Sequence, residues 1–319
     1  MTQNMYTGTF FQELLAAQTQ AQFVAAMTTT YQHILATKPA ERIAVIAREI
    51  AEHQPDLVGL QQASILRTGS GPPATTVSFD FVDILLAELA KRGKSYSIVA
   101  VVPDLDAEAP TTLGFDVRLT TRDVLIARAA SELELSNLQI RQYVGVPTVQ
   151  TPFGPFSDPS GFGAIDVNVH GRKFRFITTH FDVRPALSYF QALELIQTAV
   201  NTALPVVLVC DCNATPDLPA DPTFPSYKLI KDAGFSDAFR TAHPNDPGFT
   251  FGQAENLLNP ISSLTRRIDL ISFRGPFAIK DAHVVGANPA DRTSSGLWPS
   301  DHAGVIATLN LPASKADGE

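Results

Sequence analysis

Apolar runs alternate with amphipathic stretches along most of the chain, and this alternation predicts an α/β fold. Ile43, Ile46 and Ile50 lie three to four positions apart with charged residues between them, so a helix is expected after Pro39. The apolar run that follows this helix has the composition of a buried strand and ends in two glutamines. By the same criteria, helices are predicted over residues 9–28, 79–91, 186–202 and 226–233, and strands over residues 57–62, 96–102, 124–127, 165–170, 174–179, 205–209, 268–273, 278–285 and 303–309.

Three long stretches without this alternation are predicted to be connections. They cover residues 103–122, 145–163 and 241–264 and are rich in charged residues, glycine or proline. Long loops in compact domains are often functional, so these stretches are expected to form the walls of a substrate site. No internal repeat or clear linker divides the sequence, which predicts one domain over residues 1–319.

Composition and charge narrow the classes of protein. The 319 residues are 45% hydrophobic, which is ample for a large core. The net charge of −8 disfavours a general nucleic-acid binder, which normally carries a basic face, although a divalent cation can offset local negative charge. No apolar run is long enough to predict a transmembrane span. The first residues do not resemble a signal peptide. Removal of an export signal stays open, and the sequence determines neither compartment nor oligomeric state.

The two cysteines, Cys210 and Cys212, are separated by a single residue. This spacing is too close for an ordinary disulfide, and no histidine lies near enough in the sequence to complete a zinc site. We therefore expect both to be buried thiols of the core.

Polar side chains follow several of the predicted strands. Asp211 and Asn213 come after the strand at 205–209 and lie two positions apart, so on an extended chain both point to one side. A carboxylate and an amide oxygen on one face suit a hard cation such as Mg²⁺. The same spacing is also found in turns that close a strand, and that alternative stays open.

Asp269 emerges within an apolar strand, where an unpaired carboxylate is costly and requires a partner. A histidine is a natural partner, because the carboxylate fixes its tautomer and raises its basicity; His180 and His302 are the candidates. Asp301 directly precedes His302, and a strand that began here would point the two side chains to opposite sides. A structural role for Asp301 in capping a turn is the alternative.

Taken together, these segments resemble the endonuclease/exonuclease/phosphatase superfamily, which includes DNase I-like nucleases, abasic-site endonucleases, inositol-polyphosphate 5-phosphatases and neutral sphingomyelinases. The resemblance spans nearly the whole chain and is carried by Asn4, Leu-Val-Gly-Leu-Gln-Gln at 57–62, Thr-Thr-His at 178–180, Asp-x-Asn at 211–213, Arg-Ile-Asp at 267–269 and Ser-Asp-His at 300–302. It implies a four-layer α/β/β/α sandwich, with two packed mixed sheets, helices outside and an active site at one rim. It also implies a phosphoester hydrolase that depends on Mg²⁺, or on Mn²⁺ or Ca²⁺.

The resemblance implies catalytic roles for five residues by their motif positions. Asp211 would activate the attacking water, and Asn213 would help to position it and the phosphate. His302 would contact the phosphate while Asp269 holds its ring. His180 would be a phosphate ligand or a general acid.

The metal ligands implied by the resemblance are Asn4, Asp301 and the residue at position 62. Here the sequence departs from the family, because Gln62 stands where a glutamate is expected. Glutamine keeps an oxygen ligand but lacks the charge, which should weaken Mg²⁺ binding. Three interpretations stay open: an engineered inactivating substitution, a natural residue with activity retained through Asp211, Asp301 or a different metal preference, or a natural relative without catalysis.

The substrate side is less defined by the sequence. Arg118 and Arg184 are candidate phosphate ligands, because the guanidinium fork matches phosphate oxygens, and Trp298 is a candidate pocket wall or core residue. The acidic balance favours a small or lipid-derived phosphoester over long DNA. The alternatives are a metal-dependent nuclease of the same fold and a catalytically silent module that binds a phosphorylated ligand.

Overall fold

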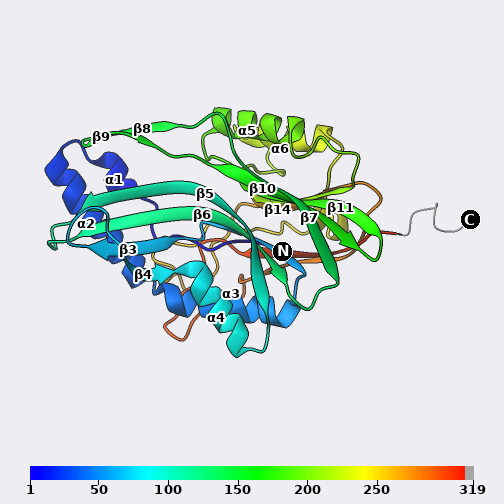
Figure 1. The fold of residues 1–319 in the computed structure, drawn as a ribbon, viewed down its shortest axis with the longest axis horizontal. Coiled ribbons are helices and arrows are strands. Elements are labelled where there is room, and N and C mark those ends of the chain that lie inside the picture. The colour runs from blue at the N-terminus through cyan, green and yellow to red at the C-terminus, as the bar shows by residue number, and fades with distance from the viewer. Residues whose placement is uncertain (313–319) are drawn as a thin grey trace, which may run out of the picture.

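The computed structural model describes residues 1–312, which form two mixed β-sheets packed face to face (Figure 1). The first sheet contains β15 (Ala278–Val285), β16 (Gly304–Asn310), β1 (Thr2–Asn4), β2 (Leu57–Gln61), β6 (Asp116–Arg128), β3 (Ile65–Gly69) and β4 (Thr76–Asp80), with β5 (Tyr96–Pro110) also paired to β6. The second contains β13 (Ser236–Asp237), β14 (Asp269–Arg274), β12 (Val206–Asp211), β11 (Arg172–His180), β10 (Gly161–Val169) and β7 (Leu133–Gln142). A separate hairpin joins β8 (Thr148–Thr151) to β9 (Gly154–Ser157).

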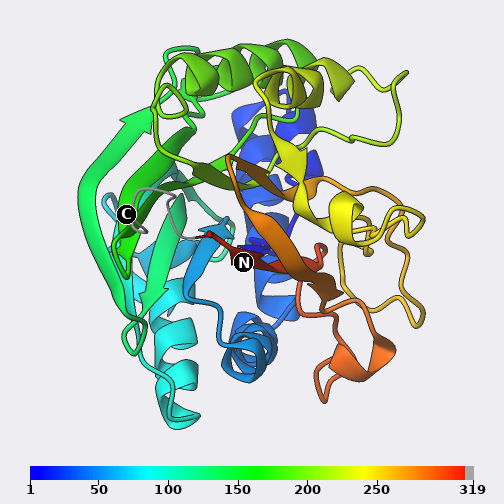
Figure 2. The same ribbon diagram turned by 90° about the vertical axis from the view of Figure 1, so that its right-hand side faces the viewer.

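Helices cover the outer faces of both sheets. Figure 2 shows α3 and α4 below the strands and α5 and α6 above them. The helices are α1 (Gln12–Ala16), α2 (Gln20–Ala36), α3 (Pro39–His53), α4 (Phe81–Lys91), α5 (Pro185–Gln197), α6 (Phe224–Asp232), α7 (Ala238–Ala242) and the 3₁₀ turn η1 (Pro289–Asp291). Among the described residues, no helix is long and apolar enough to cross a membrane.

The alternation of side chains along the strands builds this layering. Val207 and Val209 of β12 face the other sheet and meet Leu125 of β6 in the central core. Leu208 and Cys210, the intervening residues of β12, face α5 and α6. A strand that is apolar on both faces lies between two layers, so the expected four-layer sandwich is confirmed.

The prediction that residues 103–122 form a loop is wrong. Most of this stretch belongs to β5 and β6, which pair along nearly their whole length. Bulges at Ile98/Ala100 and at Pro103/Asp106 interrupt the two-residue period, and charged side chains occupy much of the exposed face. The stretch at 145–163 likewise contains β8 and β9, and β7 lies in a region for which no element was predicted.

The prediction of free thiols is also wrong, because Cys210 and Cys212 form a disulfide. Their Cα atoms are 5.0 Å apart. Residues two apart on a strand point to the same side, and because the strand ends at Asp211 the chain bends and brings these Cα atoms closer than the roughly 6.6 Å of an extended strand. Both cysteines are fully buried in the core under α5 and α6, as expected for their position.

One buried cation ties three distant segments together. The Arg42 guanidinium on α3 is fully buried and donates hydrogen bonds to the carbonyl oxygens of Met5 and Tyr6, which follow β1. It also donates to the carbonyl oxygens of Thr37 and Pro299 at 2.9 and 2.8 Å. Burial lowers the pKa of Arg42 to about 10, so the side chain stays charged at neutral pH. Arg42 therefore fixes the residues next to Asn4 against those next to His302.

Replacing Arg42 with methionine should destabilise the protein by about 3 kcal/mol or more, since buried carbonyl groups would lose charged donors. Denaturant-induced unfolding followed by circular dichroism measures the change. Arg48→Met on the same helix is the matched control. Its side chain is 38% exposed and its nearest carboxylate oxygen is 3.6 Å away, so a loss of about 1 kcal/mol or less is expected. Equal losses in the two variants would contradict the assigned role of Arg42.

Candidate active site

Three polar residues lie side by side at one end of the second sheet. In the strand register, Asp211 at the end of β12 is opposite His180 of β11 on one side and Asp269 of β14 on the other. The first sheet contributes Asn4, whose side-chain amide donates to Asp211 Oδ2 at 2.9 Å. The strand ends of both sheets therefore meet at Asp211, which is almost completely buried.

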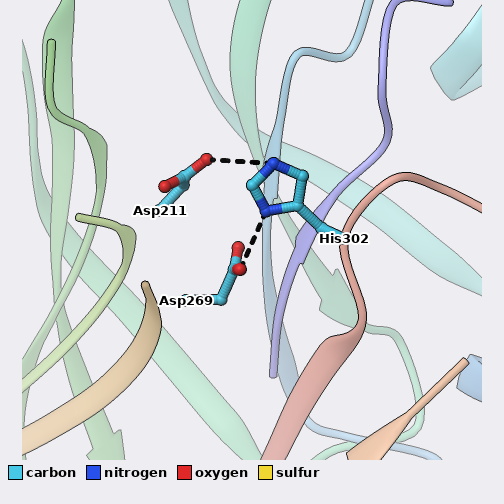
Figure 3. A group of neighbouring side chains, drawn as sticks. All are labelled: Asp211, Asp269 and His302. Carbon is cyan, nitrogen blue, oxygen red and sulfur yellow. Dashed lines mark hydrogen bonds and ion pairs between the residues drawn. The ribbon is translucent and has the colours of Figure 1, made fainter. Parts of the chain in front are cut away.

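His302 lies between two carboxylates (Figure 3). Its Nδ1 is 2.8 Å from Asp269 Oδ2, and its Nε2 is 3.7 Å from Asp211 Oδ2. The ring of Phe251 packs against the imidazole with centroids 4.7 Å apart. Burial alone would lower the pKa of His302, but Asp269, Asp301 and Asp211 outweigh it and raise the pKa to about 10. The predicted Asp269–His302 pair is present, with the imidazole protonated at neutral pH.

His180 faces the same carboxylate from the opposite side. Its Nε2 is 3.3 Å from Asp211 Oδ2 and 3.2 Å from the side-chain nitrogen of Asn213. Burial opposes its protonation, yet Asp211, followed by Asp123 and Asp104, raises the pKa of His180 to about 10. The His180 side chain is 20% exposed, so solvent reaches the group from this side.

Asp211 remains ionised between the two imidazoles. Burial would raise the pKa of Asp211, but His180 and His302 outweigh it and hold the pKa well below its usual range. The centre of the site at neutral pH is consequently one carboxylate flanked by two imidazolium groups. Their N–H groups can donate to an anion while the carboxylate accepts a hydrogen bond from water.

Asp123 is a site residue that the sequence reasoning missed. It lies on β6 with Oδ1 4.0 Å from His180 Nδ1, so it faces His180 as Asp269 faces His302, at a longer distance. Both carboxylate oxygens are buried without a hydrogen-bond partner among the described residues, and burial raises the pKa of Asp123 to about 7. The available signal was a carboxylate directly before the apolar run 124–127, as Asp301 and His302 stand before the run at 303–309. It was overlooked because the preceding residues were assigned to a loop.

Asp301 and His302 lie in a loop and not in a strand. Because β16 begins only at Gly304, the expectation that Asp301 and His302 point to opposite sides is wrong. Asp301 Oδ1 is 3.8 Å from His302 Nε2, so both side chains face the same cluster. Burial raises the pKa of Asp301 above its ordinary value, although His302 partly opposes this.

The amide oxygens of the predicted metal ligands are already engaged. Gln62 has a left-handed backbone with φ of 53°, and its Oε1 accepts from the backbone N–H of Thr7 at 3.0 Å and from the Thr7 hydroxyl at 3.3 Å. Asn4 Oδ1 accepts from the backbone N–H of Tyr6. Carboxylate oxygens of Asp211 and Asp301 both face His302 Nε2, and a hard cation would find its ligands there. Asp211, Asp269 and His302 also present ligand atoms within 4.8 Å of one another.

The three predicted substrate contacts have different outcomes. Trp298 is fully buried and donates its indole N–H to the carbonyl oxygen of Asn259, so its assignment to a substrate wall is wrong and it is a core residue. Arg118 lies on β6 five residues before Asp123, which is a distance of roughly 17 Å at the usual strand rise. Its Nε donates to Asp106 at 2.8 Å. Arg184 lies just beyond β11 and pairs with Asp182 and Asp158, and Asp158 also interacts with His180.

Comparison with known proteins identifies the fold. The structure resembles an endonuclease/exonuclease/phosphatase family protein from Leptotrichia buccalis (TM-score 0.58, 18% identity, covering 85% of this chain and 93% of that one). It also resembles the mannosyl-6-phosphatase Bt3783 of Bacteroides thetaiotaomicron (TM-score 0.56, 14% identity, 97% and 98% covered). A third match is D. rerio TDP2 complexed with a single-strand DNA product (TM-score 0.51, 14% identity, 85% and 92% covered). No family model and no curated protein matches the sequence. The chain has the endonuclease/exonuclease/phosphatase fold, as its motifs indicated.

Replacing Asp269 with asparagine should lower the pKa of His302 by roughly 1 to 3, because the nearest opposite charge is removed. The titration can be followed by NMR of the imidazole in metal-free protein. A raised folded-state pKa adds stability that is complete below the ordinary value of 6.5 and is lost as the pH rises through about 10. The free energy of unfolding should fall over that interval, and fall less in the variant.

The control for this titration is Asp123→Asn, which removes the carboxylate behind the other imidazole. It should lower the pKa of His180 more than that of His302. If Asp269→Asn left the titration of His302 unchanged, the assigned pairing would be wrong.

Proposed function

We propose that this protein hydrolyses a phosphoester of a small or lipid-derived molecule. The observation that carries the proposal is the arrangement of His180 and His302 about Asp211, which combines two cationic donors with one ionised acceptor. Such a set can bind a phosphoryl group and hold an attacking water at the same time. The phosphatase from Bacteroides thetaiotaomicron, which covers nearly the whole chain, supports this choice at the level of the fold.

In the proposed reaction, Asp211 Oδ2 orients the attacking water toward phosphorus and accepts its proton. As the new P–O bond forms, the ester P–O bond breaks and the leaving oxygen takes a proton from the imidazolium of His180. The Nε2–H groups of His180 and His302 donate to the phosphoryl oxygens, where negative charge increases during the attack. Asp269 keeps the proton of His302 on Nδ1, so that Nε2 faces the phosphate, and Asp123 does the same for His180 at longer range. Arg184 is a further phosphate ligand near the exposed side of His180.

A divalent cation held by Asp211 and Asp301, with Mg²⁺ the proposed ion, would supply additional positive charge at the phosphoryl oxygens. Asn4 donates to Asp211 and so orients this carboxylate. Gln62 contributes no charge, and both hydrogen bonds to its oxygen come from Thr7. We therefore propose weak cation affinity in this chain, whichever origin the glutamine has.

A second candidate is a silent module that binds a phosphorylated ligand. The engaged oxygen of Gln62 favours it, because binding requires the two imidazolium groups but not the cation. A nuclease is the third candidate, since the similar TDP2 structure holds a single-strand DNA product. The net charge of −8 argues against that substrate here.

Gln62→Glu should increase Mg²⁺-dependent hydrolysis at subsaturating Mg²⁺ on the order of tenfold, which corresponds to about 1.4 kcal/mol of metal affinity. The assay panel comprises sugar phosphates, a lysophospholipid, a generic phosphodiester and single-stranded DNA. Gln62→Ala is the matched control, because it removes the amide without adding a charge and should not activate.

Asp211→Asn in the Gln62→Glu background should reduce the rate by about 10²-fold or more. Retention of full activity would contradict the mechanism. If no variant hydrolyses any substrate but the unaltered protein binds inorganic phosphate, the silent module is the correct function. Cleavage of DNA alone would assign the nuclease.

A further inference from the structure

A pair of histidines meets where the end of α3 reaches the edge strand β15. His53 is the last residue of α3, and His283 lies on β15, which forms one edge of the first sheet. His53 Nδ1 and His283 Nε2 are 3.2 Å apart, and the ring centroids are 4.6 Å apart. The pair lies on the helix-covered face of the sheet, because Val285, two residues after His283, packs in the core with α3. None of the residues assigned above to the active site takes part.

A carboxylate determines which nitrogen of His283 is free. Asp281 Oδ2 is 3.0 Å from His283 Nδ1, and the two residues share one face of β15 at a spacing of two. An ionised carboxylate only accepts hydrogen bonds, so Nδ1 carries the proton and Nε2 of the neutral ring presents a lone pair. That lone pair faces His53 Nδ1. Histidines that bind metals usually donate their other N–H to a carboxylate in this way.

The surroundings of His53 favour its neutral ring. Partial burial, followed by the neighbouring His283, lowers the pKa of His53, whereas Glu52 and Asp281 oppose this more weakly. Two imidazolium groups at this distance would repel each other. The neutral imidazole is the form that binds metal ions.

We propose that His53 and His283 bind a transition-metal ion such as Zn²⁺, with Asp281 as the outer carboxylate that orients His283. Two nitrogen ligands at about 2.0 to 2.1 Å from a tetrahedral ion are roughly 3.3 to 3.4 Å apart, close to the spacing of this pair. Imidazole suits zinc, copper and nickel, whereas Mg²⁺ prefers oxygen ligands, so this site and the active site select different ions.

The site is open enough to exchange its ion with solvent. The side chain of His283 is 34% exposed and that of Asp281 is 56% exposed, and His53 is exposed at the end of its helix. Water can complete the coordination. A bound ion would join residues that are 230 positions apart and fasten the end of α3 to β15. Its effect is therefore on the stability of this edge and not on the hydrolytic reaction.

The test is a titration of the intact protein with Zn²⁺ against a chromophoric chelator, with Mg²⁺ present in excess. The unaltered protein should bind one equivalent of zinc more than His53→Gln. Asp281→Asn should keep the stoichiometry with roughly 10- to 100-fold weaker affinity at this site. His170→Gln is the control, because His170 is also exposed and bonded to a carboxylate, that of Glu132, but has no second histidine. It should bind zinc as the unaltered protein does.

Zinc should also raise the melting temperature of the unaltered protein and raise it less in His53→Gln, because only the unaltered protein can bind the ion that joins the end of α3 to β15. Any zinc that binds near His180 or His302 contributes equally to both proteins and cancels in the comparison. Equal stoichiometry and affinity in the unaltered protein and in His53→Gln would overturn the proposal, leaving a simple hydrogen bond between two neutral rings. Phosphoester hydrolysis in Mg²⁺ should be the same in both, which separates this proposal from that of the active site.

Discussion

The candidate active site depends on a buried guanidinium that touches none of its proposed catalytic groups. Among residues 1–312, no carboxylate is bonded to Arg42, which is stabilised by four backbone carbonyl groups from three segments. Two of these segments carry Asn4 and the loop with His302, whose sequence positions are almost 300 residues apart. Backbone acceptors in fixed positions need a rigid fork of donors, which lysine does not provide. The hydrogen bonds to these carbonyl groups offset the cost of burying the charge. They also fix the first strand relative to the last loop.

Held in this frame, the site is an alternation of charges among mostly buried side chains. Asp269, His302, Asp211, His180 and Asp123 form a chain of acidic and basic groups in which each ring lies between two carboxylates. Each charge would be costly if buried alone, and each is stabilised by its neighbours. Removing one member therefore changes the protonation of the next, so single substitutions here act as electrostatic changes to the whole group. The second sheet contributes Asp269, Asp211 and His180, and the first contributes Asp123 and the loop with His302, so the site exists only when the two sheets are packed together.

The sequence predicted those parts of the fold and site that local patterns determine. The helix with Ile43, Ile46 and Ile50 has a clear helical period, the run before Asp211 is a short continuous apolar stretch, and the residues that follow such runs could be assigned by motif. Of the long β5–β6 pair only 96–102 and 124–127 were predicted, because bulges shift the period of the rest and its pairing is decided by the partner strand. Asp123, which lies on β6, was not recognised as a site residue for the same reason. Trp298 was misplaced because proximity in sequence to His302 does not determine on which side of the chain a ring packs.

Gln62 changes the balance between two ways of neutralising Asp211. A divalent cation and the two imidazolium groups compete for the same carboxylate oxygens, so cation binding must release protons or draw the carboxylates away from the rings. A glutamate at position 62 would add a negative charge and favour the cation. With glutamine, whose oxygen is held by Thr7, the balance moves toward the protonated histidines. On the proposed function, that form of the site would keep the positive charge needed to hold a phosphate when no cation is bound, so substrate binding and cation binding would be separable in this chain.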